Sequence, residues 1–294
     1  MRHANKILAF IPLIASLVGC SGTPNGGNPS GGVTDAVSIF TAPYVVLDLA
    51  TGTLENRAAI PDLTSNSLWR TSKLVFHRLP SSSGTVGAAS ADLGTDLGDA
   101  PATGLTVGAT FMAVFETTQQ QWTTLGGSAA WLDPEIRAAG GDIVAAGAPA
   151  YGISWTAANE LCTSYSAGRS FHVALPNSAA WELACRSGNG GGWFSWGNAM
   201  DEATVRSYAA VFETQSGMAG PRQADGSRLA NAFGYYDLHG NVWEWLAEKD
   251  SFGDGLICGG SWNDSVPLAR CSNRISLDPQ VTHPLIGVRL VLVP

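Results

Sequence analysis

The stretch Asn231–Trp245, NAFGYYDLHGNVWEW, places turn-forming residues among five aromatic side chains, and most of the chain after Gly197 is similarly irregular. The whole chain of 294 residues holds 35 glycines and 10 tryptophans. Glycine favours turns, whereas each large aromatic side chain supplies a large buried area. The sequence therefore indicates a loop-rich fold that buried indole rings hold together, and it argues against a helical bundle.

Composition limits the size of the core and the kind of partner. Hydrophobic residues make up 45% of the chain and charged residues 14%, which is typical of a folded protein. The length allows one large domain or two small ones with a sizeable core. A formal charge of −8 argues against nucleic acid and other polyanions as partners.

The first twenty residues, MRHANKILAFIPLIASLVGC, have the layout of an export signal. Arg2 and Lys6 precede an apolar stretch, Ile7–Val18, that is too short to span a bilayer as a mature helix. The last four letters, LVGC, also resemble the bacterial lipobox, which implies cleavage before Cys20 and attachment of lipid to its thiol. The alternative is an ordinary signal peptide with an incidental cysteine. We expect a lipoprotein-type signal peptide over residues 1–19.

A flexible tether is predicted over residues 20–36, because SGTPNGGNPSGGVTD is rich in Gly, Pro, Ser and Asn and offers little to bury. Fifteen such residues reach about 20 Å. Lipid on Cys20 would make the membrane a partner. It would hold the domain at the bacterial cell envelope, on the outer membrane or the cell surface.

Strand patterns occur near both ends of the folded part. Tyr44–Glu55 alternates around a Thr-Gly turn and predicts a hairpin, and Ser72–Pro80 predicts a further strand. We assign residues 37–73 to an N-terminal β extension. Near the C-terminus, GLICGGSW and IGVRLVLV have the pattern of strands.

Three short helices are predicted in the middle of the chain. Thr103–Leu125 resembles a strand that runs into a helix beginning at one of the two threonines before QQQW. A second helix has Ser154 as its N-cap and ends at Gly168, and a third has Asn177 as its N-cap and ends at Gly188.

If Cys20 carries lipid, four cysteines remain, namely Cys162, Cys185, Cys258 and Cys271. An even number in an exported chain favours disulfides over free thiols. Four cysteines allow three pairings, and spacing alone does not choose between them.

The histidines show no metal-ligand spacing among themselves. They are His3, His77, His172, His239 and His283.

Seven motifs together resemble the formylglycine-generating-enzyme (sulfatase-modifying factor) superfamily. In order, they are FETTQQQW, GISWTAANELC, LPNSAAWELACRSG, FSWGN, NAFGYYDLHGNVWEW, GGSWND and IGVRLV. The resemblance runs from about Leu74 to Val293, so we assign residues 74–294 to a domain of this kind. It implies an α+β fold related to C-type lectins, with little regular secondary structure.

The resemblance also implies where catalytic copper would bind. Oxidase members hold copper through two cysteines that follow the GGSW segment, and the matching positions here are Asp264 and Ala269. Neither supplies the thiolate that Cu(I) needs, so no copper is expected. Ser261, Trp243 and Arg274 match other pocket positions of the family and are predicted remnants of that pocket.

Two disulfides follow from the resemblance. Cys271 matches a structural cysteine whose partner matches Cys185, which implies a Cys185–Cys271 disulfide. The usual partner of Cys162 falls at Leu290, and we predict that Cys258 replaces it.

A calcium site is implied at the GNVWEW turn. Its ligands would be Asp237, the carbonyls of Gly240 and Val242, and Glu244, all of them hard oxygen donors. The simpler alternative is that Asp237 caps the turn and Glu244 pairs with an arginine. A second calcium site of the family is expected to be lost, because Ala210 stands where an asparagine is expected.

Two surface features remain open. Six tryptophans could form a carbohydrate-stacking platform, although burial in the core is the simpler interpretation. They are Trp155, Trp181, Trp196, Trp243, Trp245 and Trp262. The loop Asn263–Pro284 would suit either a variable binding face or an ordinary surface loop.

We expect a non-catalytic module, anchored at the cell envelope, that binds a glycan, a peptide or a protein. The alternative is an enzyme of the same superfamily that acts on a protein or small thiol substrate without the usual copper cysteine pair.

Overall fold

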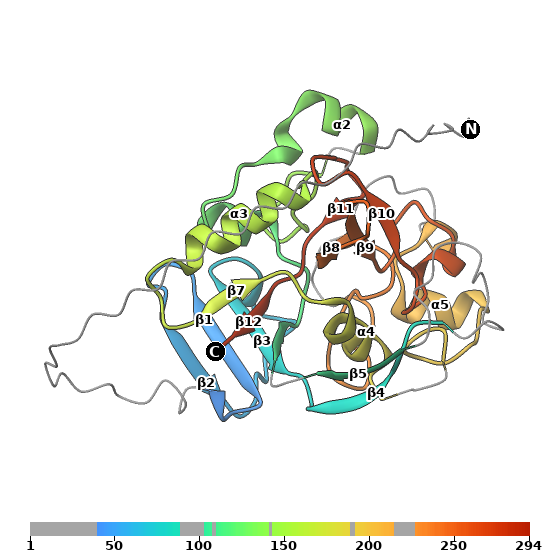
Figure 1. The fold of residues 1–294 in the computed structure, drawn as a ribbon, viewed down its shortest axis with the longest axis horizontal. Helices are drawn as coiled ribbons and strands as arrows, with labels where there is room; N and C mark the ends of the chain where they lie inside the picture. Colours follow the sequence, from blue (N-terminus) through green and yellow to red (C-terminus); the bar gives the residue numbers. More distant parts are fainter. Residues whose placement is uncertain (1–39, 89–102, 108–109, 141–142, 189–191, 215–226) are drawn as a thin grey trace, which may run out of the picture. The chain divides into compact units, whose positions relative to one another are not determined.

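The computed structural model describes residues 40–88, 103–107, 110–140, 143–188, 192–214 and 227–294. In this part of the chain, three sheets and five short α-helices are joined by long irregular segments (Figure 1). This mixture confirms the predicted α+β class with little regular secondary structure. The predicted signal peptide, the lipidated Cys20 and the tether lie outside the described residues.

The larger sheet has six strands in the order β2-β1-β3-β6-β12-β7. These strands are β1 (Tyr44–Asp48), β2 (Leu54–Arg57), β3 (Lys73–Arg78), β6 (Phe111–Ala113), β7 (His172–Ala174) and β12 (Val291–Val293). β1 and β2 form the predicted hairpin, with Leu47 opposite Leu54. Because β3 pairs with both β1 and β6, the predicted N-terminal extension belongs to the same sheet as the C-terminal strand.

The last strand of the chain, β12, lies between β6 and β7 and pairs antiparallel with both. Val291 is opposite Met112 on one side and Ala174 on the other. Figure 1 shows this red strand among blue, cyan and yellow ones from earlier parts of the chain. The sheet therefore joins segments that are far apart in sequence.

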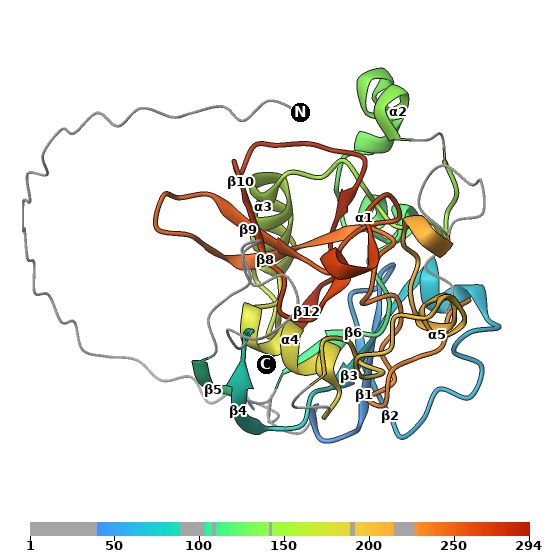
Figure 2. The same cartoon turned by 90° about the vertical axis from the view of Figure 1, so that its right-hand side faces the viewer.

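A second sheet has four strands in the order β10-β9-β8-β11. They are β8 (Trp243–Lys249), β9 (Gly255–Cys258), β10 (Ile275–Leu277) and β11 (Ile286–Gly287). Figure 2 shows β8, β9 and β10 as a layer distinct from the blue strands β1 and β2. A separate hairpin pairs β4 (Ser82–Val86) with β5 (Thr103–Val107).

The helices begin where side chains cap the first turn. They are α1 (Gln119–Thr124), α2 (Pro134–Gly140), α3 (Trp155–Ser166), α4 (Ser178–Arg186) and α5 (Glu202–Tyr208). Thr118, Ser154 and Asn177 each accept a hydrogen bond from the amide three residues further on. Each therefore satisfies an otherwise unpaired N–H, and the predicted caps are confirmed. No helix in the described part of the chain has the length and hydropathy needed to cross a bilayer.

The indole rings form much of the core. Trp181, Trp243, Trp245 and Trp262 are buried, whereas Trp155 and Trp196 are half-buried. The core interpretation is therefore confirmed for four of the six tryptophans that were candidates for a stacking platform.

Candidate functional site

Ser261, Trp243 and Asp264 meet at one carboxylate oxygen. The Trp243 indole N–H donates to Asp264 Oδ2 over 2.8 Å, and the Ser261 hydroxyl donates to the same atom. Gly260, just before this serine, has a φ of 78°, and a Cβ there would lie 3.1 Å from the Cα of Ala269. This tight turn requires glycine and directs Ser261 inward. The structure thus brings together two of the three predicted pocket residues.

An apolar pocket of about 240 Å³ lies beside Trp243. It is lined by Trp243, Ile257, Ile275, Leu277, Val281, His283, Leu285 and Ile286. All four strands of the second sheet contribute, and the loop Asn263–Pro284 supplies Val281 and His283. Ile257 and Ile286 form a buried floor, whereas Leu277 is half-buried and His283 is exposed.

His283 is the ionisable residue in the lining of this pocket. Partial desolvation lowers the pKa of His283, and the charge of Asp264 partly opposes that shift. The Nδ1 atom of His283 accepts a hydrogen bond from the Leu285 amide over 3.3 Å. The pocket therefore combines an aliphatic lining with one indole and one imidazole, whereas Asp264 is bonded to Trp243 and is not part of the lining.

Arg274, the third predicted pocket residue, does not line this pocket and contacts α4 instead. Its guanidinium donates to Glu182 Oε2 over 3.1 Å and to Ser178 Oγ over 3.0 Å. Glu182 also binds Arg186 over 2.7 Å, and all three charged side chains are buried. Arg274 is therefore part of a buried ion-pair network, and its role as a remnant of the family's pocket stays a prediction.

Asp264 and Ala269 occupy the positions that the resemblance matches to the copper cysteines. The carboxylate of Asp264 is engaged by Ser261 and Trp243. Ala269 is buried, and its carbonyl oxygen lies 2.7 Å from His239 Nδ1. Among the described residues that line the pocket, none carries a thiol. A carboxylate and a methyl side chain stand where Cu(I) would require thiolates.

The turn predicted to bind calcium has a backbone that only glycine fits. Gly240 has a φ of 84°, and a Cβ there would lie 2.1 Å from the carbonyl oxygen of Ala210. That carbonyl accepts from the Asn241 amide over 2.7 Å, and the Ala210 amide donates to the His239 carbonyl. Asp237 is buried with a φ of 58°. The predicted ligands therefore lie on one tightly folded segment.

Glu244 forms the arginine pair that was the alternative to calcium binding. Arg289 donates to both of its carboxylate oxygens, with N–O distances of 2.8–3.0 Å. The Trp181 indole donates to Glu244 Oε2 over 2.6 Å. All three side chains are almost fully buried, so this pair is screened little by solvent.

Glu116 adds a carboxylate that the sequence analysis missed. Its side chain is fully buried and accepts from the Val242 amide over 3.2 Å and from the Asn241 side chain. Burial and the negative charges of Asp237 and Glu244 raise the pKa of Glu116 well above its ordinary value. Three acidic groups thus surround this turn, close to one arginine.

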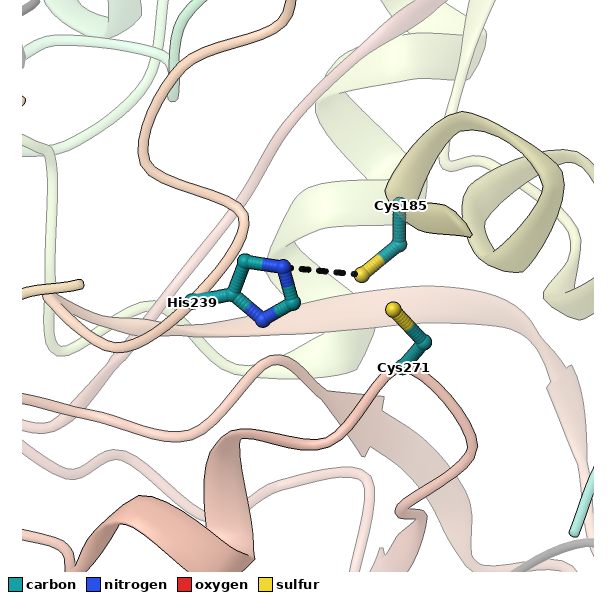
Figure 3. Close-up of side chains that lie close together, drawn as sticks. All are labelled: Cys185, His239 and Cys271. Atoms are coloured by element: carbon teal, nitrogen blue, oxygen red, sulfur yellow. Dashed lines mark hydrogen bonds between the residues drawn. The ribbon is translucent and has the colours of Figure 1, made fainter. Parts of the chain in front are cut away.

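Cys185, His239 and Cys271 form a buried cluster, called the thiol cluster below (Figure 3). The two Sγ atoms and a ring nitrogen all lie within 4.8 Å of one another. Figure 3 shows Cys185 on α4 and Cys271 on the facing loop, with the sulfurs turned toward each other. Burial opposes ionisation of both thiols, whereas hydrogen bonds from Cys185 and His239, with the nearby positive charge, lower the pKa of Cys271 to about 6.

Neither predicted disulfide is formed, and all four cysteines of the described part are free thiols. The resemblance correctly implied that Cys185 and Cys271 are neighbours. Cys162 and Cys258 lie in different hydrophobic clusters, one under α3 and the other with Cys185. The Cys162–Cys258 pairing therefore does not match the fold.

His239 is the functional candidate that spacing along the sequence did not reveal. Its position in the tight turn before Gly240 brings its ring to the two thiols, which lie on other segments. The available signal was its place inside the DLHGNVWEW motif, between two cysteines already expected to be neighbours.

The family described as "Sulfatase-modifying factor enzyme 1-like domain" matches residues 80–293. The chain belongs to this family. The match begins after β3, so β1, β2 and β3 precede the sulfatase-modifying-factor domain although they pair into its sheet.

Curated relatives match part of the sulfatase-modifying-factor domain. "Inactive C-alpha-formylglycine-generating enzyme 2" of Bos taurus is 28% identical over 153 residues, which cover 48% of this chain and 49% of that protein. "Formylglycine-generating enzyme" of Mus musculus is 32% identical over 108 residues, covering 34% and 27%. The chain thus spans about half the length of the first of these relatives.

Solved structures share the fold. "Treponema denticola variable protein 1" has a TM-score of 0.61 at 18% identity, covering 76% of this chain and 96% of that one. PvdO from Pseudomonas aeruginosa has a TM-score of 0.63 at 20% identity, covering 75% and 95%. At these identities the likeness shows the fold alone.

Proposed function

We propose that this sulfatase-modifying-factor domain is a non-catalytic binding module, held at the bacterial cell envelope by lipid on Cys20. One observation carries the proposal. Asp264, at the first position matched to the copper cysteines, accepts hydrogen bonds from both Ser261 and Trp243. The pocket keeps a defined shape through these bonds and offers no soft metal ligand. Similarity over 153 residues to a protein named as inactive supports the same conclusion.

The lining of the pocket favours an apolar side chain of a peptide or protein as the ligand. Six of its eight lining residues are aliphatic, whereas sugar rings usually stack on aromatic faces. Its volume of about 240 Å³ is below the ~300–1,000 Å³ that is usual for whole small-molecule ligands. The pocket therefore suits one large aliphatic or aromatic side chain, with His283 in the lining able to bond to the adjacent backbone.

Catalysis is tested first, on the mature chain with Cys20→Ser in place of the lipidated cysteine. The protein is loaded with Cu(I), supplied with oxygen and incubated with a sulfatase-type Cys-x-Pro-x-Arg peptide. Mass spectrometry then looks for formylglycine. We expect no conversion. Conversion would overturn the proposal and identify the domain as an oxidase that uses other ligands.

Binding is tested by selecting random phage-displayed peptides on the same protein. We expect the selected peptides to share one large apolar residue, and Leu277→Asp at the rim of the pocket to weaken binding at least tenfold. Leu229→Asp is the matched control, because Leu229 is equally aliphatic, exposed and not part of the pocket lining. Equal loss in both variants would contradict the assignment of the pocket.

The lipid anchor is tested separately, in cells. We expect the full chain to partition into detergent and to incorporate labelled fatty acid, and Cys20→Ser to do neither. Labelling that persists in Cys20→Ser would place the lipid elsewhere.

We also propose that the GNVWEW turn binds Ca²⁺. Asp237 and the carbonyls of Gly240 and Val242 supply hard oxygen donors, and Glu244 would be shared with Arg289. The donor set fits because the carboxylates of Asp237 and Glu244 outnumber the single cation Arg289, so a divalent cation would reduce the excess negative charge.

Calcium binding is measured by calorimetric titration and by thermal unfolding in calcium or in chelator. Calcium should raise the unfolding temperature of the wild-type domain and leave that of Asp237→Ala unchanged. An identical unfolding temperature for the wild type in calcium and in chelator would contradict the site.

A further inference from the structure

His239 is held in one orientation and one tautomer. Its Nε2 accepts a hydrogen bond from the Ser195 amide over 3.2 Å, so the ring hydrogen is on Nδ1 and points to the Ala269 carbonyl at 2.7 Å. Phe194 and Trp196 contact the ring edge-on, with centroid distances of 5.8 and 4.6 Å. An Nδ1–H anchored on a carbonyl is the usual second-shell arrangement of a metal-binding histidine, because it directs the Nε2 lone pair toward the metal.

The Nε2 atom lies 3.6 Å from the sulfur of Cys185 (Figure 3). Tetrahedral zinc, with Zn–S of about 2.3 Å and Zn–N of about 2.0 Å, separates sulfur and nitrogen ligands by about 3.6 Å. The same geometry separates two sulfur ligands by about 3.8 Å. The sulfur of Cys271 lies within 4.8 Å of both other ligand atoms, so a small adjustment completes three corners of the tetrahedron.

Charge and softness select the metal. Two thiolates, one neutral imidazole and Zn²⁺ sum to zero, whereas Cu(I) on the same ligands would leave a net negative charge. The three side chains are at most 3% exposed, and a neutral complex is the least costly one in such a buried place. Calcium is excluded because it takes oxygen ligands. Cys185, His239 and Cys271 thus supply three of the four positions of a tetrahedral zinc site.

We propose that Cys185, His239 and Cys271 in their dithiol form supply three ligands to one buried Zn²⁺. Binding releases the two thiol protons, and the metal replaces the bond from the Ser195 amide to Nε2. The site would join α4, the DLHGNVWEW turn and the loop after Ala269. It is independent of the peptide-binding role, because none of its three residues lines the pocket beside Trp243.

The test uses the mature chain with Cys20→Ser, reduced with a phosphine, freed of metal and kept without oxygen. It is titrated with Co²⁺, whose absorption reports thiolate ligation and four-coordinate geometry, and then with Zn²⁺ as the competitor. We expect one Co²⁺ per chain, a sulfur-to-cobalt charge-transfer band, and full displacement by an equivalent of Zn²⁺.

Cys271→Ser and His239→Ala should weaken zinc binding by at least about 100-fold. Cys162→Ser is the matched control, since it removes a buried thiol from another cluster and should bind as the wild type does. A thermal scan guards against misfolded variants. Zinc should raise the unfolding temperature of the wild type and of Cys162→Ser, but not of Cys271→Ser.

Three outcomes would overturn the proposal. One is a reduced wild-type protein that shows no charge-transfer band. Another is an equal loss of affinity in Cys162→Ser and Cys271→Ser. The third is undiminished zinc binding after the thiols have been oxidised to a Cys185–Cys271 disulfide, because the ligands would then be other residues.

Discussion

Residues 261–271 connect two regions of different chemistry. Asp264, near the start of this segment, bonds to Trp243 of the pocket, and Cys271, at its end, belongs to the thiol cluster around His239. At the start of the segment, Asp264 gathers hydrogen bonds from a serine and an indole next to an aliphatic pocket that reaches the surface. At its end, Cys271 faces a second thiol and an imidazole in a place closed to solvent.

The difference shows that a domain of this family can separate its soft ligands from its surface pocket. Asp264 and Ala269 occupy the positions that the resemblance matches to copper cysteines, while the thiols Cys185 and Cys271 lie under the surface. One region is therefore suited to contact a partner, and the other to hold segments of the chain together.

The largest expected loss of stability comes from the buried Glu244–Arg289 pair on and beside strand β8. Strand β8 sends Trp243 to the pocket and Glu244 to the buried pair with Arg289. Glu244→Gln leaves that arginine buried with its charge uncompensated, which should cost about 3–5 kcal/mol of unfolding free energy in chelator. Urea unfolding measures it. Glu55→Gln, which breaks a solvent-exposed pair with Arg57, should change little, and an equal cost in both variants would contradict the buried network.

A smaller effect is expected at the pocket alone. Asp264→Ala leaves the buried Ser261 hydroxyl and the Trp243 indole without their shared acceptor, at a cost of about 1–3 kcal/mol. Asp264→Asn keeps one acceptor oxygen and should cost less. Chemical denaturation followed by tryptophan fluorescence measures both variants. If Asn were as damaging as Ala, the loss would come from charge and not from these hydrogen bonds.

The acidic turn should make stability depend on pH. The pKa of Glu116 is raised in the folded state, so the folded protein holds a proton that the unfolded chain releases above about pH 4.3. Wild-type stability should therefore fall as the pH rises from there through the folded-state pKa. Glu116→Gln lacks this loss, so its stability relative to the wild type should increase with pH. Unfolding curves from pH 4 to 8 test this, and a constant difference would show that the carboxyl is not buried as a neutral group.

The smallest effects come from two serines that serve as matched probes of the two regions. Ser261→Ala removes the fully buried hydroxyl at the pocket, and Ser195→Ala removes the half-buried hydroxyl bonded to His239 in the thiol cluster. Each should cost about 0.5–1.5 kcal/mol in metal-free protein, with the larger value at Ser261. The reverse order would mean that the thiol cluster depends on its polar partners more than the pocket does.

Local features of the fold could be predicted from the sequence, because they depend on neighbouring residues. Ser154 and Asn177 cap their helices with their own side chains, and the Thr-Gly turn sets the first hairpin. The place of β12 between β6 and β7 could not be predicted this way, since strand order depends on contacts between distant segments.

The same distinction between local and distant contacts applies to the residues of the candidate site. Ser261 and Trp243 could be grouped from the matched motifs, and both bond to Asp264 in the structure. The partners of Arg274 could not be predicted, because the sequence does not show that Glu182 on α4 is buried beside it. His239 and Glu116 were missed for the same reason: their partners come from segments distant in sequence.

The central position of β12 also bears on how such a chain is made and exported. In the larger sheet, β6 is joined to β7 only through Val291–Val293. Synthesis on the ribosome proceeds from the N-terminus, so this sheet cannot close until those residues have emerged. Until then the chain lacks its complete hydrogen-bonded sheet, and an unfolded chain is what a translocation channel must thread. Under the proposed export, this topology would keep the larger sheet incomplete until the residues of β12 are available.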